Sequence, residues 1–447
     1  MSLLRWFLPA AGLIAGGAFA QDADADDSYV EPVEVSSDDA SAPAAPEESP
    51  FLFTGYIDIG YAYAQGNGTS WPEGDTRIPA DYVADPFATA VNSRGDVASV
   101  NSRGLFVNGF LPRSMGIGGR PSFLINTVNL DIRYTPRGFP LMFFIRTQLM
   151  PRFGSGPDMV PAGLPAGNQT RVWLQQVFAR LIPFNSVEFA LLVGKFDSVF
   201  GIEYLDNEAN LRTGITPTTL ARYTTGQSLG IKAFYRVQIP AAWSAFSINA
   251  SITNSGTRIE SLQPPDLSFS GIPVAAARLG YELNLPKLTF KLGGSGLIGP
   301  RNDQRSARVQ QWMLGLDARL YVAGVSVAGE ILRSYEAPGI ASEKFTGLGE
   351  FFAPSGFKVD GFWVQGGYTF TFDHPIFQSV ALYGRFERRN GTFHSFTPVK
   401  TARLTVGGRV DVYRSIAIKF EALLNRELPG TASVDNDVFT SSAVYTF

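Results

Sequence analysis

The chain has 447 residues with 37 basic and 40 acidic side chains, and its formal net charge is −3. It contains no cysteine and only two histidines, which excludes disulfides, thiolate sites and the usual zinc-ligand spacings. No basic cluster points to nucleic acid as a partner. A mean hydropathy of +0.03, with 46 glycines, 35 phenylalanines and 16 tyrosines, fits strands in which lipid-facing and lumen-facing residues alternate.

The first 20 residues have the layout of a secretory signal peptide. Arg5 supplies one positive charge, an apolar stretch follows, and Ala18-Phe19-Ala20 forms a small-x-small cleavage site. The stretch is short and interrupted by proline and glycine, which argues against a retained membrane helix. We therefore expect export with 1–20 removed as a signal peptide, and no lipoprotein anchor, because no cysteine follows.

Residues 21–50 hold ten acidic residues and no basic ones, together with four prolines. Such a segment cannot bury a core, so we expect a disordered acidic leader on the periplasmic side. It is either a solvated tether or a segment that binds the cell wall or a basic partner. The remaining 51–447 carries 36 basic and 30 acidic residues, a net charge of +6.

From Phe51 onward the chain shows sixteen segments of alternating polarity, each about the ten residues that a tilted barrel strand needs to cross a bilayer. In the second segment Val128 and Leu130 point to one side, and Asn129 and Asp131 to the other. A water-soluble sandwich also alternates, but it does not place aromatic and branched residues outward on every segment. The expected strands are 53–63, 127–135, 139–150, 171–182, 187–196, 228–238, 243–253, 274–284, 287–298, 309–321, 325–335, 359–370, 379–389, 401–412, 416–425 and 437–447.

The connections alternate in length. Short connections, such as those near 136–138, 322–324 and 413–415, alternate along the chain with long ones, such as 65–121, 151–170 and 197–227. This asymmetry is typical of outer-membrane barrels, with short periplasmic turns and long extracellular loops. The sequence therefore predicts an all-β protein, a transmembrane antiparallel β-barrel of about 16 strands over residues 51–447 in the bacterial outer membrane. Whether 65–121 plugs the barrel stays open.

The long connection at 197–227 is the expected constriction. It begins with Gly194-Lys195-Phe196-Asp197 and continues through Phe200-Gly201-Ile202-Glu203 and Asn207. This series resembles a family of bacterial outer-membrane β-barrel porins related to the phosphate-selective porins O and P. The resemblance implies a third loop that folds inward and narrows the pore, with Glu203, Asp206 and Glu208 facing arginines across an eyelet. The candidate constriction residues are Asp197, Glu203, Asp206, Glu208, Arg212 and Arg222. Asp197 and Glu203 are alternatively structural residues that hold the loop to the wall. The dense Arg/Lys ladder of a phosphate-selective pore is not evident in the loop.

The chain ends on a strand-like segment with apolar residues at alternate positions and a terminal aromatic. Tyr445 and Phe447 resemble the C-terminal assembly signal of outer-membrane proteins, and Phe447 is expected at the lipid–water boundary. The barrel assembly machinery and outer-membrane lipid are therefore expected partners. A homotrimer stays open, because the outward faces show no distinct polar interface patch.

A barrel of this width encloses water unless something plugs it. Alternation places acidic residues such as Asp58, Glu387 and Glu421 on the inner face with the basic residues, giving either a modest cationic bias that favours anions or a wall of cross-strand ion pairs with little selectivity. The basic residues assigned to the pore lining are Arg133, Arg146, Arg180, Lys232, Arg236, Arg278, Lys291, Arg319, Arg385, Arg403, Arg409 and Lys419.

No catalytic site, cofactor or metal is expected. His374 lies in a turn and His394 stands beside Ser395 in a long loop, where adjacent side chains on an extended chain point to opposite sides. The sequence predicts a porin for passive diffusion of small hydrophilic solutes, and whether anions are preferred among them stays open. One alternative is a channel specific for an oligosaccharide or aromatic acid, with Phe234, Trp363 and Tyr383 as stacking residues. The other is a sealed structural or adhesive surface barrel.

Overall fold

The computed structural model describes residues 49–64, 97–100, 106–111, 122–150, 171–184, 187–206, 208–224, 227–254, 273–301, 309–336, 357–393, 399–429 and 437–447. The expected signal peptide and nearly all of the expected acidic leader lie outside these residues.

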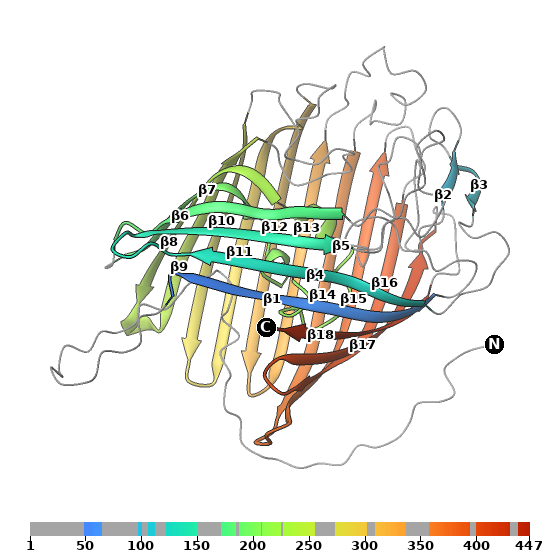
Figure 1. The fold of residues 1–447 in the computed structure, drawn as a ribbon. Helices are drawn as coiled ribbons and strands as arrows, with labels where there is room; N and C mark the ends of the chain where they lie inside the picture. The colour runs from blue at the N-terminus through green and yellow to red at the C-terminus, as the bar shows by residue number, and fades with distance from the viewer. Residues whose placement is uncertain are drawn as a thin grey trace.

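Within the described residues, sixteen strands form one closed antiparallel barrel in which each strand pairs with its neighbours in sequence and β1 pairs with β18 (Figure 1). This confirms the predicted fold class and strand count. The barrel strands are β1 (Phe51–Ala64), β4 (Ser122–Tyr134), β5 (Leu141–Met150), β6 (Arg171–Leu181), β7 (Glu188–Asp197), β8 (Gln227–Ile239), β9 (Ser244–Thr253), β10 (Val274–Leu285), β11 (Leu288–Arg301), β12 (Val309–Val322), β13 (Val325–Glu336), β14 (Phe357–Thr371), β15 (Phe377–Phe393), β16 (Val399–Val412), β17 (Ile416–Glu427) and β18 (Val438–Thr446).

The remaining elements lie in the connections. In the predicted 65–121 connection, β2 (Val97–Val100) and β3 (Phe106–Leu111) pair as a separate two-stranded sheet. Between β7 and β8 lie a 3-10 turn, η3 (Glu203–Asp206), and a short helix, α1 (Ala221–Thr224). A second 3-10 turn, η4 (Pro240–Ala242), joins β8 to β9. No helix among the described residues is both long and apolar enough to span a bilayer.

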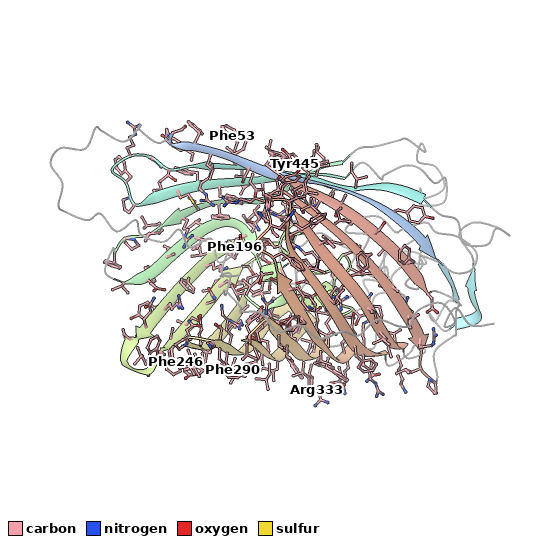
Figure 2. The ribbon with its side chains drawn as sticks, turned by 90° about the horizontal axis from the view of Figure 1, so that it is seen from below. Phe53, Phe196, Phe246, Phe290, Arg333 and Tyr445 are labelled. Carbon is pink, nitrogen blue, oxygen red and sulfur yellow. The ribbon has the colours of Figure 1, made fainter. Side chains whose placement is uncertain are left out.

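Side chains alternate between two environments along each barrel strand, as the period of two requires. On β12, Leu314 and Leu316 point outward and are 60% and 61% exposed, whereas Asp317 points inward and is 3% exposed. Figure 2 shows Phe53 and Phe246 on the outer side of the barrel in the same way. A closed antiparallel barrel with an apolar exterior leaves no unpaired sheet edge facing lipid, so we place the protein in the bacterial outer membrane.

The barrel closes where its first and last strands, β1 and β18, meet. The backbone N–H of Gly55 donates to the carbonyl oxygen of Phe447, and the N–H of Phe447 donates to the carbonyl of Gly55, both at 3.0 Å. A Cβ on Gly55 would meet both the Asn129 carbonyl and the Phe447 ring, so glycine is required for this close approach. The terminal aromatic therefore completes the last pairing of the barrel.

Short turns connect the strands at one end. Between β12 and β13 the loop is Ala323-Gly324, with φ of 48° and 84°, the left-handed pair of a type I′ hairpin turn. Aromatic residues gather near this end, including Phe51 against Tyr134, with ring centroids 4.6 Å apart, and Tyr445 against Phe447, at 6.2 Å. Such a girdle marks a membrane–water interface.

Candidate functional site

The connection between β7 and β8 folds into the barrel. Within this inward segment, residues 198–224, Phe200, Leu220 and Tyr223 are completely buried although they lie between two strands of a membrane barrel. They join Ile202 in an apolar cluster with inward-facing residues of β10 to β14, namely Val274, Leu297, Met313, Leu332, Val359 and Trp363. This part of the inner wall, which includes the predicted inward residue Trp363, is therefore apolar where it packs against the apolar side of the inward segment.

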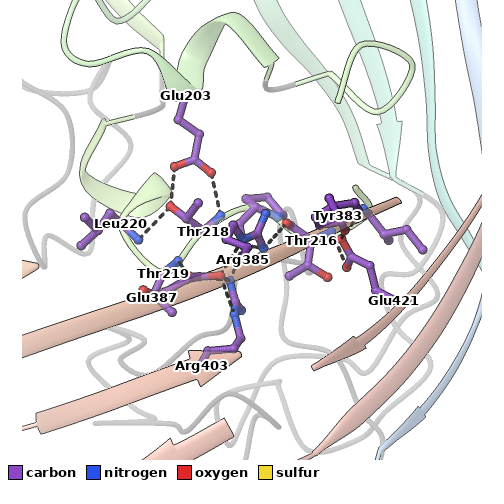
Figure 3. A network of polar contacts seen from close by, with 12 residues as sticks. Glu203, Thr216, Thr218, Thr219, Leu220, Tyr383, Arg385, Glu387, Arg403 and Glu421 are labelled. Atoms are coloured by element: carbon purple, nitrogen blue, oxygen red, sulfur yellow. Dashed lines mark hydrogen bonds and ion pairs between the residues drawn. The ribbon is translucent and has the colours of Figure 1, made fainter. Parts of the chain in front are cut away.

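Glu203 organises the segment itself. Its carboxylate accepts a hydrogen bond from the Thr218 backbone N–H at 2.6 Å and another from the Thr218 hydroxyl (Figure 3). Burial raises the pKa of Glu203, while the hydrogen bonds from Thr218 act to lower it. The bonds tie η3 to the Thr216–Thr219 stretch and support the structural interpretation of Glu203.

The next contact joins that stretch to β15 and β16. Glu387 accepts a hydrogen bond from the Thr219 backbone N–H at 2.6 Å and pairs with Arg403 at 2.8 Å and Arg385 at 2.7 Å (Figure 3). Arg385 donates to the Thr216 carbonyl at 2.8 Å. Every one of these wall residues is 3% exposed or less. Buried charges are tolerated only when paired and hydrogen-bonded, so this contact is fixed in place.

β17 holds the part of the segment that precedes this stretch. Glu421 accepts hydrogen bonds from the backbone N–H groups of Ile215 and Thr216 at 2.7 and 2.9 Å. Lys419 donates to the carbonyls of Ala209, Arg212 and Gly214. A Cβ on Gly214 would meet the Glu421 carboxylate and the Tyr383 hydroxyl, which explains a glycine at this close approach.

The segment also reaches strands on another part of the wall. Glu208 accepts hydrogen bonds from Tyr56 on β1 at 2.7 Å, from Asn129 on β4 at 2.5 Å and from Gln175 on β6 at 2.9 Å, and it pairs with Arg146 on β5 at 2.9 Å. With the contacts to β10–β17, the inward segment is thus anchored to opposite arcs of the barrel wall.

The structure places the predicted constriction residues in different roles. Asp197 ends β7 and accepts a hydrogen bond from Gln176, and Glu203 and Glu208 are buried in the bonds described above. Asp206 pairs with Arg319, yet its side chain is 43% exposed. Arg212 lies in the segment beside Lys419, and the side chain of Arg222 lies outside the described residues. Of the three acids expected at an eyelet, Asp206 is the one that reaches solvent.

Arg212 differs from the predicted acidic constriction residues in its hydrogen bonding. Its side chain is 8% exposed, and its Nε and Nη1 atoms are buried without a hydrogen-bond partner among the described residues. A guanidinium carries five donors, and burying them unpaired is costly.

Most residues predicted to line the pore carry an acidic partner. Arg146 pairs with Asp131 at 2.7 Å, and Arg278 with Asp317 at 2.6 Å. Arg180 and Lys232 are buried, and Lys232 lies 5.6 Å from the centre of the Tyr204 ring. The Nε of Arg133 is buried and has no hydrogen-bond partner among the described residues. The other ion pairs join Arg236 to Glu188 and Glu282, Lys291 to Glu282, Arg385 and Arg403 to Glu387, and Arg409 to Asp411.

Two of the three candidate stacking residues, Trp363 and Tyr383, are buried. Trp363 belongs to the apolar cluster under the inward segment, and Tyr383 is 5% exposed and donates its hydroxyl hydrogen bond to Glu421. Phe234 packs against a second cluster that includes Phe144 and Phe178. Sequence reasoning missed the threonines Thr216, Thr218 and Thr219, whose backbone and hydroxyl groups make the contacts; their only signal is a proline-containing polar run in an otherwise long connection.

Comparisons with known proteins find no matching family model and no matching curated sequence. Among solved structures the chain is similar to the outer membrane channel DcaP of Acinetobacter baumannii, at 10% identity and a TM-score of 0.49 over 89% of this chain and 97% of that one. It is also similar to an anion-selective porin from Comamonas acidovorans, at 9% identity and a TM-score of 0.49 over 89% and 99%. The resemblance to phosphate-selective porins stays a prediction, and the fold assignment rests on this chain's own strand pairing. Among the described residues no group of three or more potential metal ligands is found.

Proposed function

We propose that the protein is an outer-membrane porin in which small hydrophilic solutes diffuse through a lumen narrowed by the inward segment. The observation that carries this proposal is the anchoring of residues 198–224 inside a sixteen-stranded barrel. Glu208 of the segment binds one arc of the wall, and Glu387 and Glu421 of another arc bind the segment. A barrel of sixteen strands is too wide for wall side chains to fill, and a folded segment across it narrows the passage.

The same contacts support a preference for anions. Wall charges that are paired with neighbours cancel at the distance of a passing solute, so they add little net field. Among the described residues, two nitrogens of Arg212 have no hydrogen-bond partner, while Asp206 is balanced by Arg319. In a narrow passage with low-dielectric walls an unbalanced guanidinium concentrates anions. We propose Arg212 as the residue that sets this preference for anions. The proposal does not extend to specificity for phosphate.

A second candidate is a sealed structural or adhesive barrel. The close packing of the inward segment on both arcs of the wall favours it, because a tightly filled lumen would not conduct. A solute-specific channel has less support, since Trp363 and Tyr383 are covered by the segment.

Liposome swelling separates these functions. The protein, refolded in detergent and inserted into liposomes, should admit small sugars and organic acids and should exclude oligosaccharides above a size limit. Swelling by one sugar alone indicates a specific channel, and no swelling with folded, heat-modifiable protein indicates the sealed barrel. A homotrimer, proposed by analogy with wide porins, is tested on the same sample by light scattering of the detergent-solubilised protein.

A further inference from the structure

Basic side chains gather on the outer surface of five consecutive strands, from β13 to β17. Inward neighbours fix their direction: Leu332 and Ser334 are each 1% exposed on either side of Arg333, and Glu387 and Arg389 are completely buried on either side of Arg388. Side chains on Arg333 and Arg426 are 70% and 64% exposed, and Figure 2 shows Arg333 on the outer margin of the barrel. This basic sector consists of Arg333, Lys358, Arg388, Lys400 and Arg426.

Pairing between strands makes the sector continuous. Arg333 faces Asp360 on β14, Asp360 faces Asn390 on β15, and Asn390 faces Lys400 on β16. The next outward row joins Arg388 to Ala402, and Ala402 to Arg426 on β17. The interpretation that the outward faces lack a distinct polar patch is therefore wrong, because residues far apart in sequence become neighbours through this register.

The sector lies at the end of the barrel that carries the long connections. Lys358, Arg388, Lys400 and Arg426 stand roughly 10 to 13 residues from the short-turn ends of their strands at Thr371, Phe377, Val412 and Ile416. With a rise of about 3.3 Å per residue and a tilt of about 40°, this corresponds to about 25 to 33 Å along the barrel axis. The apolar band of a membrane barrel is about 25 Å tall, so these charges lie at the outer lipid–water boundary.

Two aromatic residues mark the same height. Trp312 and Tyr335 face outward on β12 and β13 with ring centroids 6.2 Å apart, and the Lys358 ammonium lies 5.7 Å from the centre of the Tyr335 ring. Tryptophan and tyrosine prefer the headgroup level. Arg333, closer to the short-turn end, can extend its long side chain to that level.

Among the described residues, two acids form ion pairs with the five residues of the basic sector. Asp360 pairs with Arg333 at 2.5 Å and Asp437 pairs with Arg426 at 2.8 Å. Arg388, exposed and outward, has no ion-pair or hydrogen-bond partner among the described residues. At the same height β8 and β11 carry Leu229 and Ile298 outward, so an excess of positive charge at this level is not a general property of the barrel.

We propose that the basic sector binds the phosphate groups of the glycolipid in the outer leaflet, lipopolysaccharide. Guanidinium groups bind phosphate with paired hydrogen bonds, and ammonium groups add point charge. Phe362 on β14 lies directly opposite Arg388, and Ile331 on β13 lies opposite Phe362, so acyl chains find an apolar surface beside the headgroup. A second copy docked by the same face about a two-fold axis would set like charges together, which disfavours that occupant.

The experiment compares lipopolysaccharide binding by the refolded, lipid-free protein and by the triple variant Lys358→Gln, Arg388→Gln, Lys400→Gln. The matched control replaces three exposed basic residues of the short turns, Arg137→Gln, Lys287→Gln and Arg414→Gln. Titration of purified lipopolysaccharide should show binding at least tenfold weaker in the sector variant and unchanged in the control. Wild-type protein should bind the enzymatically dephosphorylated glycolipid at least tenfold more weakly.

Heat-modifiable migration verifies that both variants are folded before the comparison. Equal affinity of the sector variant and wild type, or equal affinity of wild type for the phosphorylated and dephosphorylated lipids, overturns the proposal. A lipid-free wild-type oligomer that becomes monomeric only in the sector variant also overturns it, because the sector is then a contact between copies.

Discussion

The carboxylate of Glu421, on the next-to-last strand, accepts a hydrogen bond from the backbone N–H of Ile215 at 2.7 Å, across 206 positions of sequence. The wall of this barrel therefore binds the peptide backbone of the inward segment as well as its side chains. Glu387 does the same for Thr219. These two acids therefore hold the segment through its backbone, in addition to the contacts of Glu208 and Lys419.

Replacing Glu421 by glutamine should loosen the inward segment. The amide has one acceptor oxygen for two backbone donors, and leaving one buried N–H unpaired costs about 1 to 3 kcal/mol. We expect a larger single-channel conductance and faster trypsin cleavage after Arg212. The control Glu188→Gln, which alters a carboxylate paired with Arg236 rather than with the segment, should change neither. Identical cleavage of the Glu421 variant and wild type would show that this anchor is dispensable.

Arg212→Gln should lower the permeability of anions relative to cations. A unit charge at about 4 Å in water contributes about 1 kcal/mol, so a severalfold change in the ratio is expected. The channel should still assemble, because the Nε and Nη1 atoms of Arg212 have no hydrogen-bond partner among the described residues. Reversal potentials at low salt measure the ratio, and Arg212→Lys should restore most of it. An unchanged potential would remove Arg212 from the filter.

Asp206→Asn should act in the opposite direction. Its side chain is 43% exposed and neutralises Arg319, so the variant leaves the Arg319 charge unbalanced in the lumen. The same reversal-potential measurement should then show a higher anion preference, with the effect shrinking at high salt as screening increases. A shift toward cations would contradict the assigned geometry.

Docking of the segment should depend on pH through Glu203. Burial raises its pKa above the ordinary value near 4.5, with Thr218 and Arg385 opposing the rise and Glu387 adding to it. The docked state therefore holds the proton more tightly, so docking loses stability as pH rises from about 4.5 through the raised pKa. Cleavage after Arg212 should be faster at the upper end of this window, measured with a protease active across it. Glu203→Gln should flatten the profile, and an unaltered profile in that variant would assign the pH dependence to another group.

Removing Phe447, or changing it to serine, should reduce the amount of folded barrel in the outer membrane. The residue closes the backbone pairing with Gly55 and contributes an aromatic ring to the short-turn girdle. Heat-modifiable migration of membrane fractions measures the folded amount, and Phe439→Ser serves as a control that removes an outward aromatic of the same strand without touching the terminal pair. Normal assembly without Phe447 would refute its role as an assembly signal.

The strands were predictable because each one has lipid on one side and water on the other. Apolar and polar side chains therefore alternate over most of each membrane-spanning strand. Prediction failed beyond the bilayer, where that constraint ends. β4 begins at Ser122 rather than near 127, and β15 continues to Phe393 rather than 389. The inward residues Met313 and Leu332 were also missed. Each stands next to another apolar residue, in Met313-Leu314 and Ile331-Leu332, so the sequence does not show which of the two points inward.

The inward location of 198–224 agrees with the expectation drawn from its motif, but the partners of its residues had no sequence signal. Glu387 and Glu421 were expected as wall carboxylates, and nothing in their neighbourhood reveals that they bind backbone N–H groups at Thr219 and Ile215. Such contacts depend on how a long connection crosses the lumen, which local periodicity does not encode.

The most direct test of the proposed constriction is single-channel conductance in planar bilayers. Wild type should be compared with a variant in which 208–220 is replaced by a short glycine-serine linker, both shown to be heat-modifiable. The account predicts an open, ohmic channel for wild type and a clearly larger conductance for the variant. No conductance in wild type, or the same conductance in both proteins, would contradict a channel narrowed by the inward segment.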